Sequence, residues 1–300
     1  DPRVLRAAVQ YQRNGLGKAL VIGREKEVAD LLTAEGLEDA VAEIEVVNAA
    51  NTDHLNDYKT FLYDRLKRKG FDSSDIHRLA ARDRHVFGAL MLAHGHGDGL
   101  VTGATRKSAH VLELINHVFD ASPKSGAVGV SAIINKGRIV LLGDTLVHEW
   151  PDEEDLANIA ERGADVARDL GLDPRVAFVS FSTFGYPVSE RASKMQVAPQ
   201  ILDARGVDFE YEGEMAVDVA LNPRAADHYP FSRLTAPANV LVVPARHSAS
   251  ISVKLMQEMG GATVIGPILA GVDKPIQICS TVSTVNDILN MAAIAACNVK

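Results

Sequence analysis

Three segments place hydroxyl groups and cations after a run of apolar residues. They are residues 103–108 (GATRKS), 246–250 (RHSAS) and 274–283 (KPIQICSTVS). Backbone N–H groups at the start of a helix, with Ser or Thr hydroxyls and a few cations, are groups that hold phosphate in proteins. Each segment alone is a weak signal, but together they predict one polyanion pocket. The side chains expected to face its ligand are Thr105, Arg106, Lys107, Arg246, His247, Ser248, Ser250, Lys274 and Ser280.

Ser182 and Thr183 follow a fourth, almost wholly apolar run, residues 176–181 (VAFVSF). This places them at the carboxyl end of a predicted strand, where open α/β sheets bind ligands, so they join the predicted pocket. Hydroxyls that only cap the following turn are an equally good explanation. The glycines around Ser182 are in the wrong places for a nucleophile elbow.

Other titratable residues carry weaker signals. Asp144 follows the apolar run at 138–143 and is a candidate for a base or a helix cap, while a lone histidine such as His148 is more often structural than catalytic. His94 and His96 lie two residues apart, with no further ligand nearby at metal spacing. We therefore expect no metal site.

The elements that would position these side chains alternate between strand and helix, which indicates an α/β protein. Strands are predicted at 18–23, 43–47, 100–101, 127–134, 138–143, 176–181, 239–244 and 263–269. Helices are predicted at 74–94, 152–170, 251–259 and from 283 or 284 to 298, the last apolar almost all round. Asn135-Lys136-Gly137 predicts a hairpin between two of the strands. We expect one lobe to comprise residues 1–126 and 270–300, and a second lobe to comprise residues 127–269.

Composition excludes several classes of partner. The chain has 300 residues and a formal charge of −8, and its longest basic run, residues 65–69, has no interleaved aromatics, so no nucleic-acid partner is expected. No apolar run reaches the roughly 18–20 residues that cross a bilayer, so no membrane partner is expected. Two cysteines fit neither a disulfide framework nor a zinc motif and favour the cytoplasm. Because the chain opens with Asp1-Pro2-Arg3, we expect a fragment of a longer polypeptide.

The loops named above lie in longer segments that resemble the phosphotransacetylase family, in order and spacing, over essentially the full chain. These include GDGLVTGATRKSAHVL, EYEGEMAVDVALNP and VNDILNMAAIAA. The stretches SKMQ, PARHSASISVKLMQEMGG and KPIQICS resemble most closely the phosphotransacetylase-like C-terminal domain of hybrid NADP-dependent malic enzymes. The resemblance implies a two-lobed, three-layer αβα fold with an interlobe cleft, similar to isocitrate and isopropylmalate dehydrogenases, and a dimer formed through the second lobe.

The sequence departs from the family at residues that carry the chemistry. The family's Ser-Arg pair falls on Ser280 and Thr281, although its aspartate is kept as Asp287. One family arginine falls on Glu113, and another near Leu66. Loss of one preorganised transition-state contact typically costs roughly a hundred- to a thousandfold in rate, so no catalytic residues are expected here.

The resemblance therefore implies a catalytically silent domain that regulates and assembles a malic enzyme, with acetyl-CoA or a related acyl-CoA as allosteric effector. No cofactor is expected in this chain, because NADP and Mg²⁺ or Mn²⁺ would belong to the upstream malic enzyme domain. Expected partners are the acyl-CoA, that upstream domain and further copies of the chain. Two alternatives stay open: an active phosphate acetyltransferase that makes acetyl phosphate and CoA from acetyl-CoA and phosphate, and a purely structural assembly module.

Overall fold

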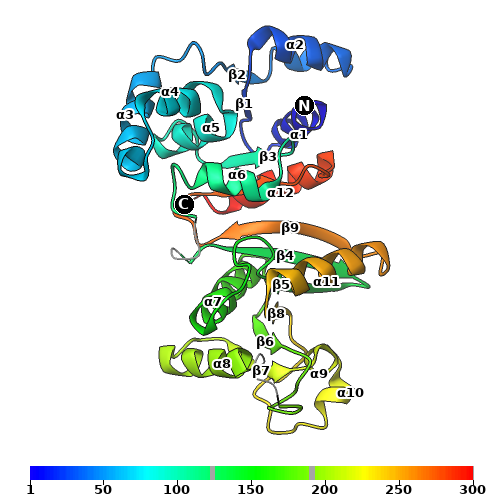
Figure 1. Cartoon of the computed structure of the whole chain (residues 1–300). Helices are drawn as coiled ribbons and strands as arrows, with labels where there is room; N and C mark the ends of the chain where they lie inside the picture. The colour runs from blue at the N-terminus through cyan, green and yellow to red at the C-terminus, as the bar shows by residue number, and fades with distance from the viewer. Residues whose placement is uncertain (122–125, 189–192, 300) are drawn as a thin grey trace. The chain divides into compact units, whose positions relative to one another are not determined.

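The computed structural model describes residues 1–121, 126–188 and 193–299, which form two compact units (Figure 1). Unit 1 comprises Asp1–Ala121 and Val272–Lys300, and unit 2, inserted between these segments, is Ser122–Gly271. Within the described ranges, no helix is both long and apolar enough to span a membrane.

Unit 1 is built from two short pairs of parallel strands covered by helices. The strands are β1 (Leu20–Ile22) with β2 (Glu45–Val47), and β3 (Leu100–Gly103) with β10 (Ile276–Cys279). The helices are α1 (Pro2–Arg13), α2 (Glu25–Ala34), η1 (Glu38–Val41), α3 (Leu55–Leu66), η2 (Lys67–Lys69), α4 (Ser73–Arg82), α5 (Arg84–Ala93), α6 (Ser108–Ile115) and α12 (Val285–Cys297).

The helix predicted over 74–94 is two helices, because Asp83 adopts an extended backbone between α4 and α5. Its side chain accepts hydrogen bonds from the backbone N–H groups of His85 and Val86, and so caps α5. Gly88 on α5 lets the helix pack closely on the sheet, since a Cβ there would lie 3.0 Å from side-chain atoms of both Ile22 and Leu100. One helix therefore covers strands from both pairs.

The last helix is confirmed, with Thr284 as its cap. Thr284 and Asp287 form a capping box, in which each side chain accepts a hydrogen bond from the other residue's backbone. Helix α12 packs against α1 on one side and against β3 and β10 on the other, which agrees with its predicted burial on two sides.

Unit 2 contains a six-stranded mixed sheet in the order β7-β6-β8-β5-β4-β9. The strands are β4 (Val128–Asn135), β5 (Arg138–Gly143), β6 (Arg175–Val179), β7 (Glu210–Met215), β8 (Val240–Val242) and β9 (Thr263–Ala270). Its helices are α7 (Glu153–Asp169), α8 (Ser193–Arg205), α9 (Val217–Leu221), α10 (Pro223–Ala226) and α11 (Arg246–Glu258). Strands β5, β8, β6 and β7 are parallel, so their carboxyl ends share one edge of the sheet.

The predicted hairpin is confirmed as the antiparallel pair β4–β5, whose turn has positive φ at Lys136 and Gly137. Side chains alternate between the two faces of the sheet. Gly143 faces α7, where an added Cβ would lie 2.9 Å from a methyl group of Ile159. Leu142 instead belongs to a core cluster with Ala249 of α11. Helices therefore cover both faces (Figure 1).

Candidate functional site

In unit 1, the parallel pairing of β3 and β10 brings together the loops that follow them. Gly103 pairs with Cys279 at the carboxyl end of both strands. Gly103 has φ +100°, and a Cβ there would lie 2.2 Å from the Cys279 carbonyl oxygen. The Ala104 N–H donates to that same oxygen at 3.1 Å. Residues 104–107 therefore lie beside residues 280–284, so two of the three predicted polyanion loops meet.

The guanidinium group of Arg3, which is far from both loops in the sequence, forms hydrogen bonds to each of them. Arg3 Nη1 donates to the backbone oxygens of Thr281 at 3.0 Å and Ser283 at 2.7 Å. Its Nη2 donates to the Ala104 oxygen at 3.1 Å and pairs with Asp1 at 2.9 Å. Sequence reasoning missed Arg3, because nothing in its local sequence indicates that it contacts loops so far along the chain.

Some polar groups of the paired loops already have a hydrogen-bond or ion-pair partner in the protein, and others are exposed. Arg106 forms an ion pair with Asp83 at 2.7 Å. Lys107 precedes α6, whose N terminus has no side-chain cap, so its first N–H groups keep their capacity to bind an anion. The Ser280 Oγ lies 3.2 Å from Ser283 Oγ and accepts from the Val282 N–H, within a tight turn. Thr105 is exposed beside them.

The positions where the family carries charged catalytic groups are occupied differently. Thr281 is exposed, and Glu113 projects from α6 with 74% of its side chain exposed. Leu66 is fully buried in the core, and the adjacent Arg65 donates to the His117 carbonyl at 3.4 Å. The Asp287 carboxylate accepts from Thr284 N–H and Oγ1 in the capping box of α12.

Lys274 lies apart from Ser280, at the amino end of β10. The sequence treats residues 274–283 as one loop, but residues 276–279 form a buried strand. Its apolar residues, Ile276, Ile278 and Cys279, are fully or almost fully buried between helices. The two polar parts of the segment therefore lie at opposite ends of β10.

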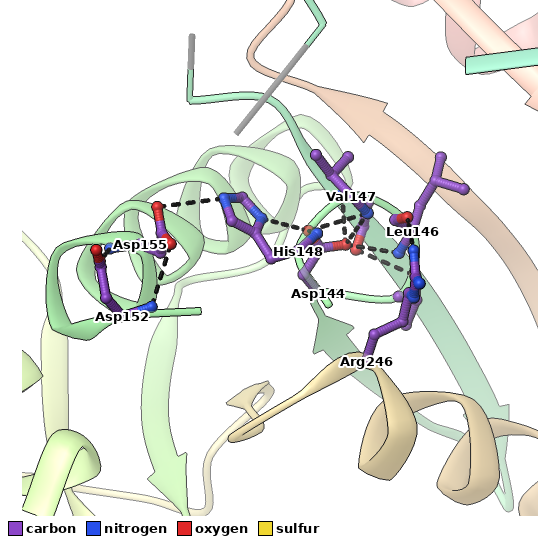
Figure 2. A network of polar contacts seen from close by, with 9 residues as sticks. Asp144, Leu146, Val147, His148, Asp152, Asp155 and Arg246 are labelled. Atoms are coloured by element: carbon purple, nitrogen blue, oxygen red, sulfur yellow. Dashed lines mark hydrogen bonds and ion pairs between the residues drawn. The ribbon is translucent and has the colours of Figure 1, made fainter. Parts of the chain in front are cut away.

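In unit 2, the loop after β5 is organised around the buried Asp144 (Figure 2). Its Oδ1 accepts from the backbone N–H groups of Gly129, Leu146 and Val147 at 2.6–3.0 Å. Its Oδ2 accepts from His148 N at 2.8 Å and His148 Nδ1 at 2.6 Å. Gly129 permits this arrangement, because a Cβ there would lie 2.4 Å from the Leu146 Cβ. A carboxylate that accepts this many hydrogen bonds organises the loop, which favours the capping role over that of a base.

His148 connects this loop to α7 (Figure 2). Its ring is buried, with Nδ1 against Asp144 and Nε2 at 3.5 Å from Asp155 Oδ1. Asp155 also forms a capping box with Asp152 at the start of α7. Nε2 makes no hydrogen bond within the described part of the chain. The imidazole therefore lies between the Asp144 loop and the start of α7.

The predicted ligand residues at 246–250 lie in the first turns of α11, which begins at Arg246 and not at residue 251. Arg246 Nη1 donates to the Leu146 carbonyl at 3.1 Å (Figure 2). Its Nη2 lies 3.4 Å from Glu149. His247 lies 3.7 Å from Glu149 and is 61% exposed. Ser248 Oγ donates to the Ala245 carbonyl at 2.8 Å, and Ser250, two residues later, is half-buried. The N-cap residue of α11, Ala245, supplies no side-chain cap.

Ser182 and Thr183 are held by protein groups. Ser182 is fully buried and its Oγ donates to Glu214 Oε1 at 2.8 Å. Glu214, itself buried, also accepts from the Gly185 N–H at 2.9 Å. Thr183 Oγ1 accepts from the Ala216 N–H at 3.0 Å. A ligand would have to displace these bonds to reach either hydroxyl.

Burial shifts two titratable groups near the β3–β10 pair. It raises the pKa of the Cys279 thiol to about 12, with a smaller contribution from Asp287. It also lowers the pKa of His85, whose Nδ1 lies 2.6 Å from Thr102 Oγ1 on β3. Neither group is therefore charged at neutral pH. In the residues that the structure covers, no group of three His, Cys, Asp or Glu side chains has metal-binding geometry.

Comparison of the sequence with known proteins finds two kinds of relative. The NADP-dependent malic enzyme of Rhizobium meliloti is 48% identical over 298 residues, which cover 99% of this chain and 39% of that protein. The phosphate acetyltransferase of Thermoanaerobacterium thermosaccharolyticum is 30% identical over 99% of this chain and 92% of its own length. The chain thus spans about two fifths of the malic enzyme and nearly all of the acetyltransferase.

The fold leads to the same group. A phosphotransacetylase from Streptococcus pyogenes superposes with a TM-score of 0.90 at 28% identity, covering 100% of this chain and 91% of that one. The sequence model of phosphate acetyl/butaryl transferases matches residues 1–296. The chain therefore belongs to the phosphate acetyl/butaryl transferase family.

Proposed function

We propose that this chain is a regulatory and assembly domain of a cytoplasmic NADP-dependent malic enzyme, and that it binds acetyl-CoA without transferring the acetyl group to phosphate. The proposal rests mainly on one observation. The β3–β10 loops keep the fold and the uncapped α6 N terminus of an anion-binding site, but Thr281 and Glu113 occupy positions where the family resemblance expects arginines.

The chemistry explains why those two positions decide between binding and turnover. Phosphate and the leaving thiolate are both negatively charged, so cations must hold them together in the transition state. A threonine hydroxyl supplies no charge, and a carboxylate repels both groups. Arg106 and Lys107 still offer cations for the phosphates of a CoA ligand.

The test is calorimetric titration of the whole chain with acetyl-CoA and, separately, with free CoA. We expect saturable binding of acetyl-CoA with a micromolar Kd and weaker binding after Lys107→Gln. Glu258→Gln, an exposed change on α11, is the matched control. Absence of saturable binding by folded protein would contradict the effector role and leave assembly as the function.

A second assay separates the silent domain from an active acetyltransferase. Acetyl phosphate formation from acetyl-CoA and phosphate should be at background in the native chain. If the missing cations cause the silence, Thr281→Arg with Glu113→Arg should raise the rate, whereas Thr281→Gln with Glu113→Gln should not. Turnover by the native chain would reject the silent domain and favour the enzyme.

Self-association is the second part of the proposal, and an apolar stripe on α11 supports it. Ile251, Leu255 and Met259 recur every four residues and are 67%, 58% and 81% exposed. Side chains at this spacing share one helix face. Leu255→Lys should shift the chain towards monomer in light scattering, whereas Gln257→Lys, on another face, should not. A native chain that is monomeric would contradict this part alone.

A further inference from the structure

A cavity in unit 1 lies at the carboxyl ends of the other pair of parallel strands. Its volume is about 500 Å³, and its walls come from the ends of β1 and β2 and from the junction of α4 with α5. Arg24, Arg82 and Arg84 line it, together with Asn48 and the small side chains of three alanines. Among the described residues, the walls therefore carry three cations and no carboxylate.

Two of these arginines have no partner among the residues that the structure describes. Arg24 forms an exposed ion pair with Glu27 at 2.6 Å. Arg82 and Arg84, by contrast, form no side-chain hydrogen bond or ion pair with any residue that the structure describes. The carboxylate between them in sequence is already engaged, because Asp83 Oδ1 caps α5 and Oδ2 pairs with Arg106 at 2.7 Å.

Backbone donors at the strand ends add to this positive character. Across the described residues, the N–H groups of Arg24 and Ala49 donate to no protein acceptor. Helix α2, which begins after Arg24, has no side-chain cap from its N-cap residue. Glu25, the first residue of α2, is engaged by the protein, because its carboxylate accepts from Asn48 Nδ2 at 3.0 Å.

We propose that this cavity is a separate anion site that binds a small phosphate-bearing ligand through Arg82 and Arg84. Two unpaired guanidinium forks suit the several oxygens of a phosphate group, which accepts paired N–H donors. The alanine walls leave more room than one phosphate requires, so the ligand class is a phosphate ester or a pyrophosphate. The proposal does not depend on acetyl-CoA binding at the β3–β10 loops.

The test is calorimetric titration of the full chain with inorganic pyrophosphate. We expect saturable binding that weakens about tenfold or more in Arg82→Gln with Arg84→Gln, because charge-assisted hydrogen bonds are lost. Arg68→Gln with Arg78→Gln is the control, since both are exposed arginines outside the cavity. Far-UV circular dichroism checks that both double variants remain folded.

Each outcome is decisive. No saturable binding of pyrophosphate by the native chain, or an equal loss in the control variant, would overturn the proposal. A parallel titration with acetyl-CoA checks that the site is separate, and its affinity should not change in Arg82→Gln with Arg84→Gln. If that variant lost both ligands to the same extent, the cavity would hold the phosphates of acetyl-CoA and the separate site would be refuted.

Discussion

Replacing Asp144 should be among the most destabilising single changes in unit 2. The carboxylate is 2% exposed and accepts from four backbone N–H groups, those of Gly129, Leu146, Val147 and His148. Alanine at this position orphans all four donors and also the His148 ring. At the lower limit of about 1 kcal/mol for each orphaned buried donor, Asp144→Ala should lower the free energy of unfolding by about 4 kcal/mol.

Asparagine should cost less, because it keeps one acceptor oxygen. With its oxygen in the place of Oδ1, the hydrogen bonds from Gly129, Leu146 and Val147 survive, while its NH₂ group faces the His148 N–H. One or two donors are then lost, so we expect Asp144→Asn to cost about 1–3 kcal/mol. Both variants remove the charge of Asp144. The difference between their free energies of unfolding therefore reports the hydrogen bonds of the loop.

Urea unfolding provides the assay, followed by far-UV circular dichroism and by the fluorescence of Trp150, the single tryptophan, which follows this loop. Asp173→Ala is the control, since its side chain is 91% exposed and lies 3.7 Å from Arg175. An exposed pair of this kind contributes about 1 kcal/mol or less. If Asp144→Ala costs no more than this control, the reasoning on orphaned donors is refuted.

Three further predictions concern residues of unit 1. Gly103→Ala forces a side chain into φ +100° and against the Cys279 carbonyl, so it should cost about 2 kcal/mol or more in urea unfolding. Gly97→Ala, where a Cβ meets nothing within 4 Å, should cost less than about 1 kcal/mol, and equal costs would contradict the argument. Because burial lowers the pKa of His85, the unfolded chain takes up that proton first. The stabilisation is therefore complete above the unfolded pKa of 6.5 and declines as the pH falls below it. The urea midpoint should drop between pH 8 and 5.5, less so in His85→Gln, and an unchanged drop in that variant would refute the assignment. Finally, a disulfide reagent should label the exposed Cys297 quickly and Cys279, with its pKa of about 12, only after unfolding, so two fast thiols in native protein would be unexpected.

Elements with strong local signals are predictable from the sequence. Residue type and spacing predict the hairpin at Lys136-Gly137 and the helix starts near Asp152 and Thr284, and the structure has all three there. The broad α/β alternation follows from the same signals. Helix α8 was not predicted, because Pro199 lies inside it and its apolar residues follow no clear stripe. Strand β10 was not predicted either, because four residues are too few for a pattern.

The candidate site was predictable in its residue types but not in its assignments. Loops rich in Ser, Thr and cations do follow the strands, as the sequence indicates. Whether such a group is available to a ligand depends on distant partners, such as Glu214 for Ser182 and Asp83 for Arg106. Arg82 and Arg84 were not predicted as site residues, although they have no partner among the described residues. Only the break between α4 and α5 places them beside the strand ends.

The pairing of β3 with β10 also determines the order in which the two units can fold during synthesis. Strand β3 ends at Gly103, but its partner begins at Ile276, about 170 residues later. At 5–20 residues per second, synthesis takes on the order of 10 to 35 s to cover that interval. Throughout it, one edge of β3 has no strand to pair with, while unit 2 receives its last strand, β9, before unit 1 is complete. The middle segment of the gene thus encodes the unit that can close first, and a ribosome that stops before residue 276 would release a chain whose first unit lacks β10.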